Sequence, residues 1–266
     1  MNNTRKKIAI ISSSLLLALA GCVGGGGSIS SGSVSSLTGV TVARSIENGF
    51  FARQMGGEAS TGAARTQLRG RAESNEPFFD EEYELYGKIS ENRVDYFLDQ
   101  ALTQPAGGYS KSFVTTATGY VLNFALGITA GPYTGLSYTR DLTLDGSLIT
   151  FSSTGQRPGA GSFAIVGSVT DGRTVIQSTN RDADGVNRFY NVTVEADGSS
   201  KVEYNTNQLF SYTLNYAADQ SGSGTVTGNS ALLPANLTWN SEGTGTLVFA
   251  NGTTLNFVNF EFNSLP

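Results

Sequence analysis

Residues 120–128, YVLNFALGI, decide the fold class, because large and small side chains alternate along the whole stretch. Every second residue is large and apolar or aromatic: Tyr120, Leu122, Phe124, Leu126 and Ile128. Successive side chains of a β-strand point to opposite faces, so a period of two predicts a half-buried strand. Residues 188–196, RFYNVTVEA, repeat the alternation. The second half of the chain therefore reads as β-structure.

Turn signals separate these alternating runs at short intervals. Four Asx-Gly pairs mark such turns: Asp145-Gly146, Asp171-Gly172, Asp197-Gly198 and Asn251-Gly252. A two-residue Asn-Gly loop at the last pair predicts a hairpin with Val248 opposite Leu255 and Thr246 opposite Phe257. Short strands joined by tight turns, without helices between them, predict an antiparallel β-sandwich or a soluble β-barrel over residues 109–266.

The preceding part, residues 40–108, reads as a small helical segment. In residues 91–105 the apolar residues Val94, Phe97, Leu98, Ala101 and Leu102 recur with helical spacing. Ser90 stands where an N-cap belongs, and Pro105 follows the run. A shorter helix is expected from an N-cap at Asn75 to Gly87. Weaker helical patterns cover residues 45–55 and 60–72.

The chain begins with three basic residues, Arg5 to Lys7, followed by an apolar run from Ile8 to Ala20. This run is too short to span a bilayer and ends in small residues, which is the pattern of a secretory signal peptide. Leu19-Ala20-Gly21-Cys22 resembles the lipobox of bacterial lipoproteins. That resemblance implies cleavage before Cys22, acylation of its sulfur and a stable membrane anchor.

The resemblance also bears on location and organisation. Val23 follows the lipidated cysteine in place of the aspartate that retains lipoproteins in the inner membrane, which favours the outer membrane. The expected parts are a signal peptide (1–21), the lipidated cysteine with a Gly/Ser tether (22–39), the helical segment (40–108) and the β domain (109–266). Whether the protein faces the surface or the periplasm stays open.

Composition narrows the function. The chain has no histidine, which removes the commonest general base and zinc ligand. Without the leader and its three cations, 14 basic and 22 acidic residues leave a net charge of −8. An acidic chain without a basic cluster is not expected to bind nucleic acid. No G-x-S-x-G, S-x-x-K or Walker-type motif is present, so catalysis is not expected.

Two polar stretches are candidate sites. Asn180, Asp182 and Asp184, followed by Gly185, match the first positions of a calcium loop, although Asn191 stands where its final glutamate belongs. A polar turn is the alternative reading, and no other cofactor is expected. The carboxylates of residues 80–84, DEEYE, suit either paired acid-base chemistry or a solvated helix start.

The aromatic residues offer a third possibility, a sugar-stacking platform. Its candidates are Trp239 and the tyrosines of the β domain: Tyr109, Tyr120, Tyr133, Tyr138, Tyr190, Tyr204, Tyr212 and Tyr216. Core packing is the alternative for each. Taken together, the sequence predicts an outer-membrane lipoprotein that binds a glycan or protein ligand without catalysis. The alternatives are a structural partner of an envelope assembly and a carboxylate-based glycan hydrolase.

Overall fold

A computed structural model describes residues 38–62, 74–90, 92–159, 161–182, 185–206 and 209–262. The lipobox and most of the tether therefore lie outside the described residues. The one helix among them is α2 (Gly39–Gly62). The strands are β1 (Ser74–Asp80), β2 (Leu85–Ser90), β3 (Arg93–Phe97), β4 (Pro105–Thr115), β5 (Gly119–Ile128), β6 (Ser137–Asp145), β7 (Leu148–Arg157), β8 (Gly161–Thr170), β9 (Arg173–Arg181), β10 (Asn187–Val194), β11 (Ser200–Thr206), β12 (Phe210–Tyr216), β13 (Gly222–Gly228), β14 (Ala235–Trp239), β15 (Gly245–Phe249), β16 (Thr254–Val258) and β17 (Glu261–Phe262).

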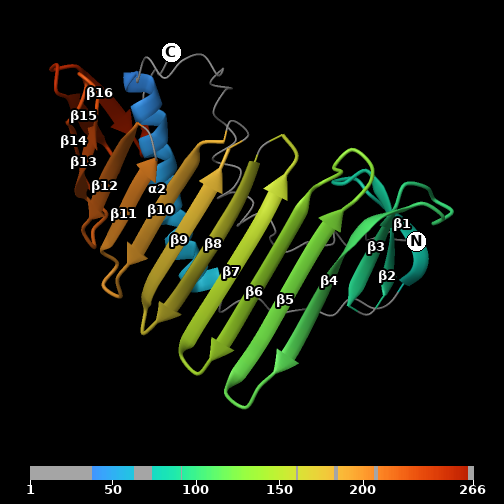
Figure 1. Cartoon of the computed structure of the whole chain (residues 1–266). Helices are drawn as coiled ribbons and strands as arrows, with labels where there is room; N and C mark the ends of the chain where they lie inside the picture. The colour runs from blue at the N-terminus through green and yellow to red at the C-terminus, as the bar shows by residue number, and fades with distance from the viewer. Residues whose placement is uncertain are drawn as a thin grey trace, which may run out of the picture.

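All seventeen strands belong to one antiparallel sheet. Each strand pairs with the next along the chain, so the topology is a simple up-and-down meander (Figure 1). Such a connection needs only short hairpin loops, which explains the frequent turn signals. The predicted mainly β, antiparallel fold preceded by a helix is confirmed, in the form of one open, curved sheet. The bounds of its parts are corrected: the described helix ends at Gly62 and not near residue 108, and the strands begin at Ser74 and not at residue 109.

The sheet has two faces of different chemistry, which the alternation of the sequence produces. We call the face toward α2 the inner face and the opposite face the outer face. The inner face of β5 carries the large residues of 120–128, whereas Asn123 and Ala125 face outward and are exposed. Across β9–β13 the inner face is buried and the outer face is mostly Ser, Thr, Asn and Gln.

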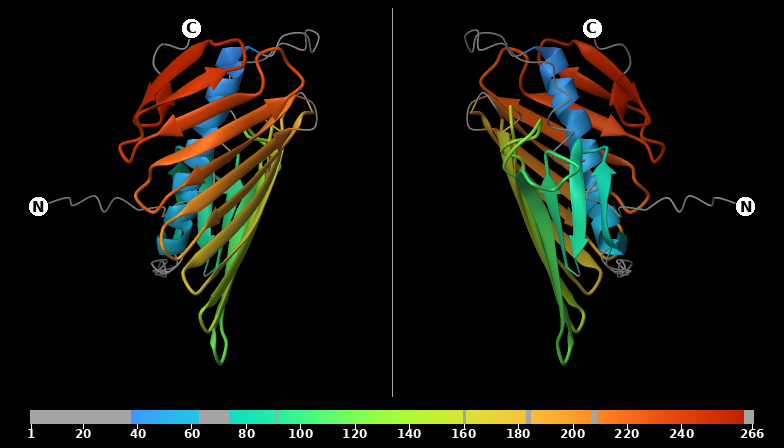
Figure 2. Two further views of the ribbon diagram at one scale, coloured as in Figure 1. Left: turned by 90° about the vertical axis from the view of Figure 1, so that its left-hand side faces the viewer. Right: turned by 90° about the vertical axis from the view of Figure 1, so that its right-hand side faces the viewer.

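α2 lies against the concave inner face, and the last strands curl over its beginning (Figure 2). It contacts β9, β10, β11 and β17. Val42, Ile46 and Phe50 are buried in one core with the inner side chains of the C-terminal strands. A hydrogen bond holds the helix as well: the Tyr212 hydroxyl donates to the Ser45 carbonyl oxygen at 2.7 Å.

In the described part of the chain no helix has the length and apolarity to cross a membrane.

The hairpin register at Asn251-Gly252 corrects the prediction by one residue. Val248 pairs with Thr254 and not with Leu255, and Thr246 pairs with Asn256 and not with Phe257. The loop has three residues, because the Gly252 amide bonds the Phe249 carbonyl and Gly252 then takes a positive φ of 83°. A type I turn followed by a left-handed glycine is the common three-residue hairpin.

The same three-residue loop recurs in the neighbouring hairpins. The loops of 196–198, 218–220 and 241–243 show the same pair of backbone hydrogen bonds, and each has its third residue at positive φ. By contrast, Asp171-Gly172 forms a two-residue turn with both residues at positive φ, as its sequence suggests.

The helices expected at residues 75–87 and 91–104 are wrong. These residues form β1, β2, β3, the beginning of β4 and the loops between them. Gly87 does not close a helix: the Phe78 ring of the neighbouring strand lies where a Gly87 Cβ would stand, at 2.3 Å. Asp99 organises the loop of 98–104 by accepting the backbone amides of Thr103 and Gln104 at 2.9 Å.

Strand formation wins here because Val94 and Tyr96 also alternate with outward-facing residues, and both are buried between β2 and β4. The weaker pattern at residues 45–55 is helical, as predicted. Of the pattern at residues 60–72, the first three residues end α2 and the others lie outside the described residues.

Candidate functional site

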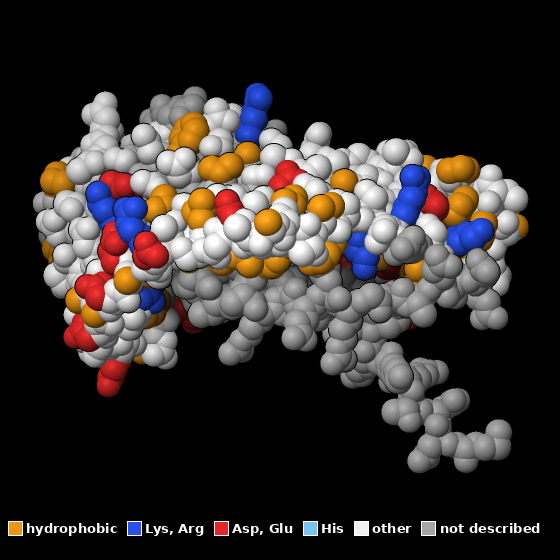
Figure 3. Space-filling model, turned by 90° about the horizontal axis from the view of Figure 1, so that it is seen from below, with side chains coloured by type: hydrophobic (Ala, Val, Ile, Leu, Met, Phe, Trp, Pro, Cys, Tyr) orange, Lys and Arg blue, Asp and Glu red, His pale blue; other side chains and the backbone are white. Residues whose placement is uncertain are grey.

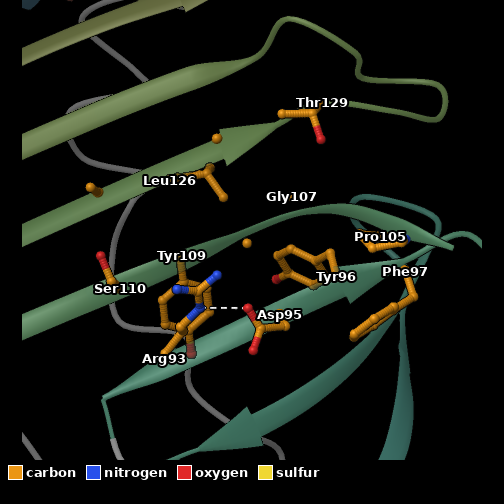
Figure 4. Close-up of a pocket in the computed structure, with 13 residues that line it drawn as sticks. Arg93, Asp95, Tyr96, Phe97, Pro105, Gly107, Tyr109, Ser110, Leu126 and Thr129 are labelled. Carbon is orange, nitrogen blue, oxygen red and sulfur yellow. Dashed lines mark hydrogen bonds and ion pairs between the residues drawn. The ribbon is translucent and has the colours of Figure 1, made fainter. Parts of the chain in front are cut away.

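A hollow of about 610 Å³ opens on the outer face over β3, β4 and β5 (Figure 4). It is lined by Arg93, Asp95, Tyr96, Phe97, Pro105, Gly107, Gly108, Tyr109, Ser110, Ala125, Leu126, Gly127 and Thr129. Its volume is within the range of small-molecule sites, which is roughly 300–1,000 Å³. The hollow is therefore the candidate binding site on the flank of the sheet.

The strand register explains why the sheet is hollowed here. Across the three strands, Asp95 lies opposite Gly108, which in turn lies opposite Gly127. In the adjacent row on the same face, Ser110 lies between Arg93 and Ala125. In both rows the β3 residue has the largest side chain, whereas the β4 and β5 residues are small. The outer surface is therefore lower over β4 and β5 than over β3. The floor is then mainly backbone and small side chains.

The two floor glycines have different reasons for being glycine. A Cβ at Gly108 would stand 2.3 Å from the Val94 carbonyl oxygen, so the close approach of β3 excludes any side chain. A Cβ at Gly127 would meet nothing within 4 Å, and its φ is not in the left-handed region. Packing does not require glycine at Gly127, yet its absent side chain keeps the hollow open.

The rim of the hollow combines one ion pair with apolar surface. Arg93 Nε lies 2.5 Å from Asp95 Oδ1, and Asp95 is the single carboxylate among the lining residues. The Phe97 and Pro105 side chains, paired across β3 and β4, line another part of the rim. Exposed ion pairs of this kind contribute about 0–1 kcal/mol to stability, so this pair is available to a ligand.

The floor is held from below by a hydrogen-bonded tyrosine. The Tyr96 hydroxyl donates to Asp80 Oδ2 at 2.8 Å and ties β3 to the end of β1. Burial raises the pKa of Tyr96 far above its ordinary value, and the charge of Asp80 adds to this effect. Tyr96 therefore stays a neutral donor at physiological pH, and its role here is structural.

A ladder of polar side chains continues the outer face beyond the hollow. Ser112 Oγ donates to Asn123 Oδ1 at 3.0 Å, and Asn123 Nδ2 donates to Asp141 Oδ1 at 2.6 Å. In the neighbouring row the Thr139 and Thr154 hydroxyls lie 2.7 Å apart. These residues are exposed on β4–β7. They present hydroxyl, amide and carboxylate groups along one line from the hollow.

The calcium-loop residues do not lie together as a described site. Asn180 is buried on the inner face of β9, and Asp182 forms an ion pair with Arg188. Asp184 lies outside the described residues. The described residues hold no group of three His, Cys, Asp or Glu side chains placed to bind a metal. The calcium site stays a prediction.

The other predicted candidates fall elsewhere. Cys22 lies outside the described residues. Asp80 ends β1, with its Oδ1 accepting the Glu82 amide, so residues 80–84 form a turn and not a helix start. Burial and the nearby Asp80 charge raise the pKa of Glu82.

The predicted stacking platform at Trp239 is wrong for that residue. Its side chain is buried in the α2 core, where Nε1 donates to the Gln220 carbonyl at 2.9 Å. The tyrosines of β10–β12 are buried in the same core. Among the proposed aromatic residues only Tyr109 belongs to the lining of the hollow, and its ring stacks on Phe124 on the inner face.

No protein-family model and no curated protein matches this sequence. The site is therefore interpreted from its own residues. Sequence reasoning missed the hollow because residues 91–104 were assigned to a helix. The available signal was Gly107-Gly108 beside an alternating strand, since paired glycines in a strand pattern mark a close backbone approach.

Proposed function

We propose that this protein is an outer-membrane-anchored lipoprotein that binds an envelope or surface glycan without chemically changing it. The observation that carries this proposal is the hollow over β3–β5 with its continuing polar ladder. The lipobox resemblance at Leu19–Cys22, followed by Val23, supports the proposed outer-membrane location.

A glycan suits the hollow because a sugar ring has an apolar face and a rim of hydroxyl groups. Phe97 and Pro105 offer apolar surface for the ring. Asp95 and Ser110 offer polar groups to the hydroxyls. The ladder of Ser112, Asn123 and Asp141 would serve further sugar units along the same face. This arrangement favours an extended glycan over a single small sugar.

The carboxylates favour binding over hydrolysis. A glycosidase needs two carboxyl groups about 5–10 Å apart across the scissile bond. The lining of the hollow has only Asp95, which is paired with Arg93. The aspartates whose pKa values are lowered, Asp99, Asp197 and Asp219, cap exposed turns through hydrogen bonds from nearby hydroxyl and amide groups. These lowered pKa values are therefore explained by the hydrogen bonds of the turns.

The anchor is tested by fractionating cells that express the protein with a C-terminal tag. The natural chain is expected in the outer-membrane fraction, and the Cys22→Ala variant outside the membranes. Protease treatment of intact cells then decides the side, since a surface protein loses its tag. If the Cys22→Ala variant still fractionated with membranes, the lipid-anchor part of the proposal would be wrong.

The ligand class is tested by probing an array of bacterial envelope and animal-cell glycans with the purified chain. Gly127→Trp fills the hollow from a position where an added Cβ meets no atom within 4 Å, so this variant is expected to fold and to lose binding. Val248→Trp, at an exposed outer position of β15 away from the hollow and the ladder, is the matched control and is expected to bind normally.

Two results would count against a glycan. If the natural chain bound no glycan, or bound equally after Gly127→Trp, the hollow would not be a glycan site. Co-purification of an envelope protein at fixed stoichiometry, lost in Gly127→Trp, would instead indicate the structural-partner alternative.

A further inference from the structure

A second polar cluster lies on the inner face of β6 and β7, on the opposite side of the sheet from the hollow. Its members are Tyr138, Arg140 and Ser153. The Tyr138 hydroxyl, Arg140 Nε and the Ser153 hydroxyl are all buried, and none has a hydrogen-bond partner. Three buried, unpaired polar atoms in neighbouring positions need an explanation, because buried polar groups in native proteins are nearly always paired.

The register places these three residues in neighbouring positions on one face. Arg140 lies directly opposite Ser153 in the β6–β7 pairing. Tyr138 is two residues before Arg140 on the same strand and therefore on the same face. Directly opposed residues have Cβ atoms about 4.5–5.5 Å apart, so one small group can contact both Arg140 and Ser153.

Leaving these groups unpaired is costly. An unsatisfied buried donor costs roughly 1–3 kcal/mol, and a charged one costs more. All three groups can donate hydrogen bonds: guanidinium N–H and two hydroxyl O–H groups. Donors around a fixed positive charge match an oxygen anion, and arginine suits the planar carboxylate.

The charges on the inner face also favour an anionic ligand. The inner positions of β4–β8 carry three cations, Lys111, Arg140 and Arg157, and no acidic residue. Lys111 and Arg140 flank Phe124 in one cross-strand row. Neither Lys111 nor Arg140 forms an ion pair with a described residue. This part of the sheet therefore has positive charge that is not neutralised within the described chain.

The surroundings of the cluster are apolar and aromatic. The Tyr138 ring lies 5.7 Å from the Phe124 ring and 6.2 Å from the Phe163 ring, measured between centroids. Leu142 and Phe151 continue the apolar inner face on the other side of Arg140 and Ser153. A ligand at this place meets donors at one end and hydrocarbon around them.

We propose that the inner face of β6 and β7 binds the carboxylate of an amphipathic molecule, with Arg140, Ser153 and Tyr138 holding the carboxylate oxygens. The apolar part of the ligand lies against Phe124 and Phe163. This site is separate from the outer hollow, and its ligand is distinguished from a glycan by its negative charge and its hydrocarbon chain.

The test is calorimetric titration of decanoate into the exported chain carrying Cys22→Ser, so that no acyl group of the protein competes. Decanol, which has the same chain length without the charge, and inorganic phosphate, which has charge without the chain, are the comparison probes. Decanoate is expected to bind at one site, and both comparison probes at least tenfold more weakly.

Matched variants locate the site. Arg140→Gln is expected to weaken decanoate binding at least tenfold, and Tyr138→Phe, which removes only a hydroxyl, about three- to tenfold. Arg181→Gln on the exposed outer face of β9 removes the same charge elsewhere and should leave the affinity unchanged. Equal binding by Arg140→Gln, or equal affinity for decanol or phosphate, would overturn the proposal.

A second measurement covers a variant that binds nothing because it is unfolded. Without ligand, Arg140→Met removes the buried, unpaired Nε donor, so its denaturation midpoint is expected to equal or exceed that of the natural chain. A lowered midpoint, together with no binding of decanoate by the natural chain, would mean that Arg140 is satisfied within the protein itself. That result would also overturn the proposal.

Discussion

The two halves of the sheet use the same hairpin meander but bury their inner faces differently. In β9–β17 the inner face closes on α2, and Phe50 packs among Tyr216, Trp239, Phe257 and Phe260 at centroid distances of 5.0–6.5 Å. In β4–β7 the inner residues near the hairpin ends are more open, and Phe113 is 53% exposed. The underside in Figure 3 accordingly shows hydrophobic side chains between groups of charged ones.

The two halves therefore differ in how much apolar core they have. The C-terminal half shares one continuous core with α2. The N-terminal half has a smaller core around Leu85, Val94 and Tyr96, and it also has the hollow and the unpaired Arg140 cluster. Ligand-binding regions are commonly found in the less stable parts of a structure, and the smaller core makes the N-terminal half the less stable part here.

The largest expected effect is on the α2 core. Phe50→Ala should lower the free energy of unfolding by about 3–5 kcal/mol, because it empties a site enclosed by four aromatic rings. Phe113→Ala removes the same ring from an exposed hairpin end and should cost less than about 1 kcal/mol. Guanidinium denaturation of both variants measures the contrast. Equal losses would mean that the two halves do not differ in burial.

A pair of glycine substitutions should give effects of opposite sign. A Cβ at Gly49 of α2 would lie 2.5 Å from the Tyr212 hydroxyl oxygen, which is fixed by its bond to Ser45. Gly49→Ala should therefore destabilise the protein by about 1–2 kcal/mol, despite the higher helix propensity of alanine. Gly127→Ala enters open space and should stabilise by a few tenths to about 1 kcal/mol.

Guanidinium denaturation measures the change in unfolding free energy for both variants. If Gly49→Ala stabilised the protein, α2 would not lie as close to β12 as the structure has it. If Gly127→Ala destabilised it, the floor of the hollow would be packed and not open.

The sequence alone predicted β structure in the C-terminal part because its alternation is clear and most of its three-residue turns have glycine at the positive-φ position, with Gln220 as the exception. It failed by one residue at Asn251-Gly252, since a two-residue and a three-residue loop share the same Asn-Gly signal. It failed more at residues 91–104, where apolar residues fit both periods. Only the neighbouring strands, which bury Val94 and Tyr96, decide between them.

The sites were harder to predict because they depend on residues far apart in the chain. The hollow arises where Gly108 and Gly127 become neighbours, and the cluster where Arg140 meets Ser153. Neither pair has a local signature. Conversely, the aspartate-rich loop had a local signature, but Asn180 faces the inner core and Asp182 pairs with Arg188, which local spacing cannot reveal.

A smaller effect concerns the polar side of α2. Arg53 Nε donates to Ser200 Oγ at 3.0 Å, and its guanidinium lies 5.0 Å from the centre of the Tyr216 ring. Burial lowers the pKa of Arg53. Arg53→Met keeps the aliphatic stem and removes both contacts, so it should cost about 1–2 kcal/mol of unfolding free energy. Ser200→Ala, which removes only the hydrogen bond, should cost less. An equal loss in both variants would exclude a contribution from the Tyr216 contact.

The smallest effect is a dependence on acid that the hairpin turns contribute in both halves. Hydrogen bonds from the Ser221 hydroxyl and amide lower the pKa of Asp219 below its ordinary value of 3.8, and Ser199 does the same for Asp197. In the N-terminal half, the Thr103 hydroxyl, followed by the Gln104 amide, lowers the pKa of Asp99.

A carboxyl group whose pKa is lower in the folded state stabilises the protein above its unfolded pKa, and this stabilisation is lost as the pH falls through the folded pKa. The melting temperature should therefore decrease below about pH 4. A triple variant with Asp99, Asp197 and Asp219 each changed to Asn should show a smaller decrease, because the amide oxygen still accepts hydrogen bonds but does not titrate. Calorimetric melting between about pH 2.5 and 6 measures both curves. An unchanged slope in the triple variant would assign the acid sensitivity to other carboxylates. A slope reduced equally by Asp99→Asn alone and by the two C-terminal changes together would show that turn chemistry, unlike core burial, is shared evenly by the two halves.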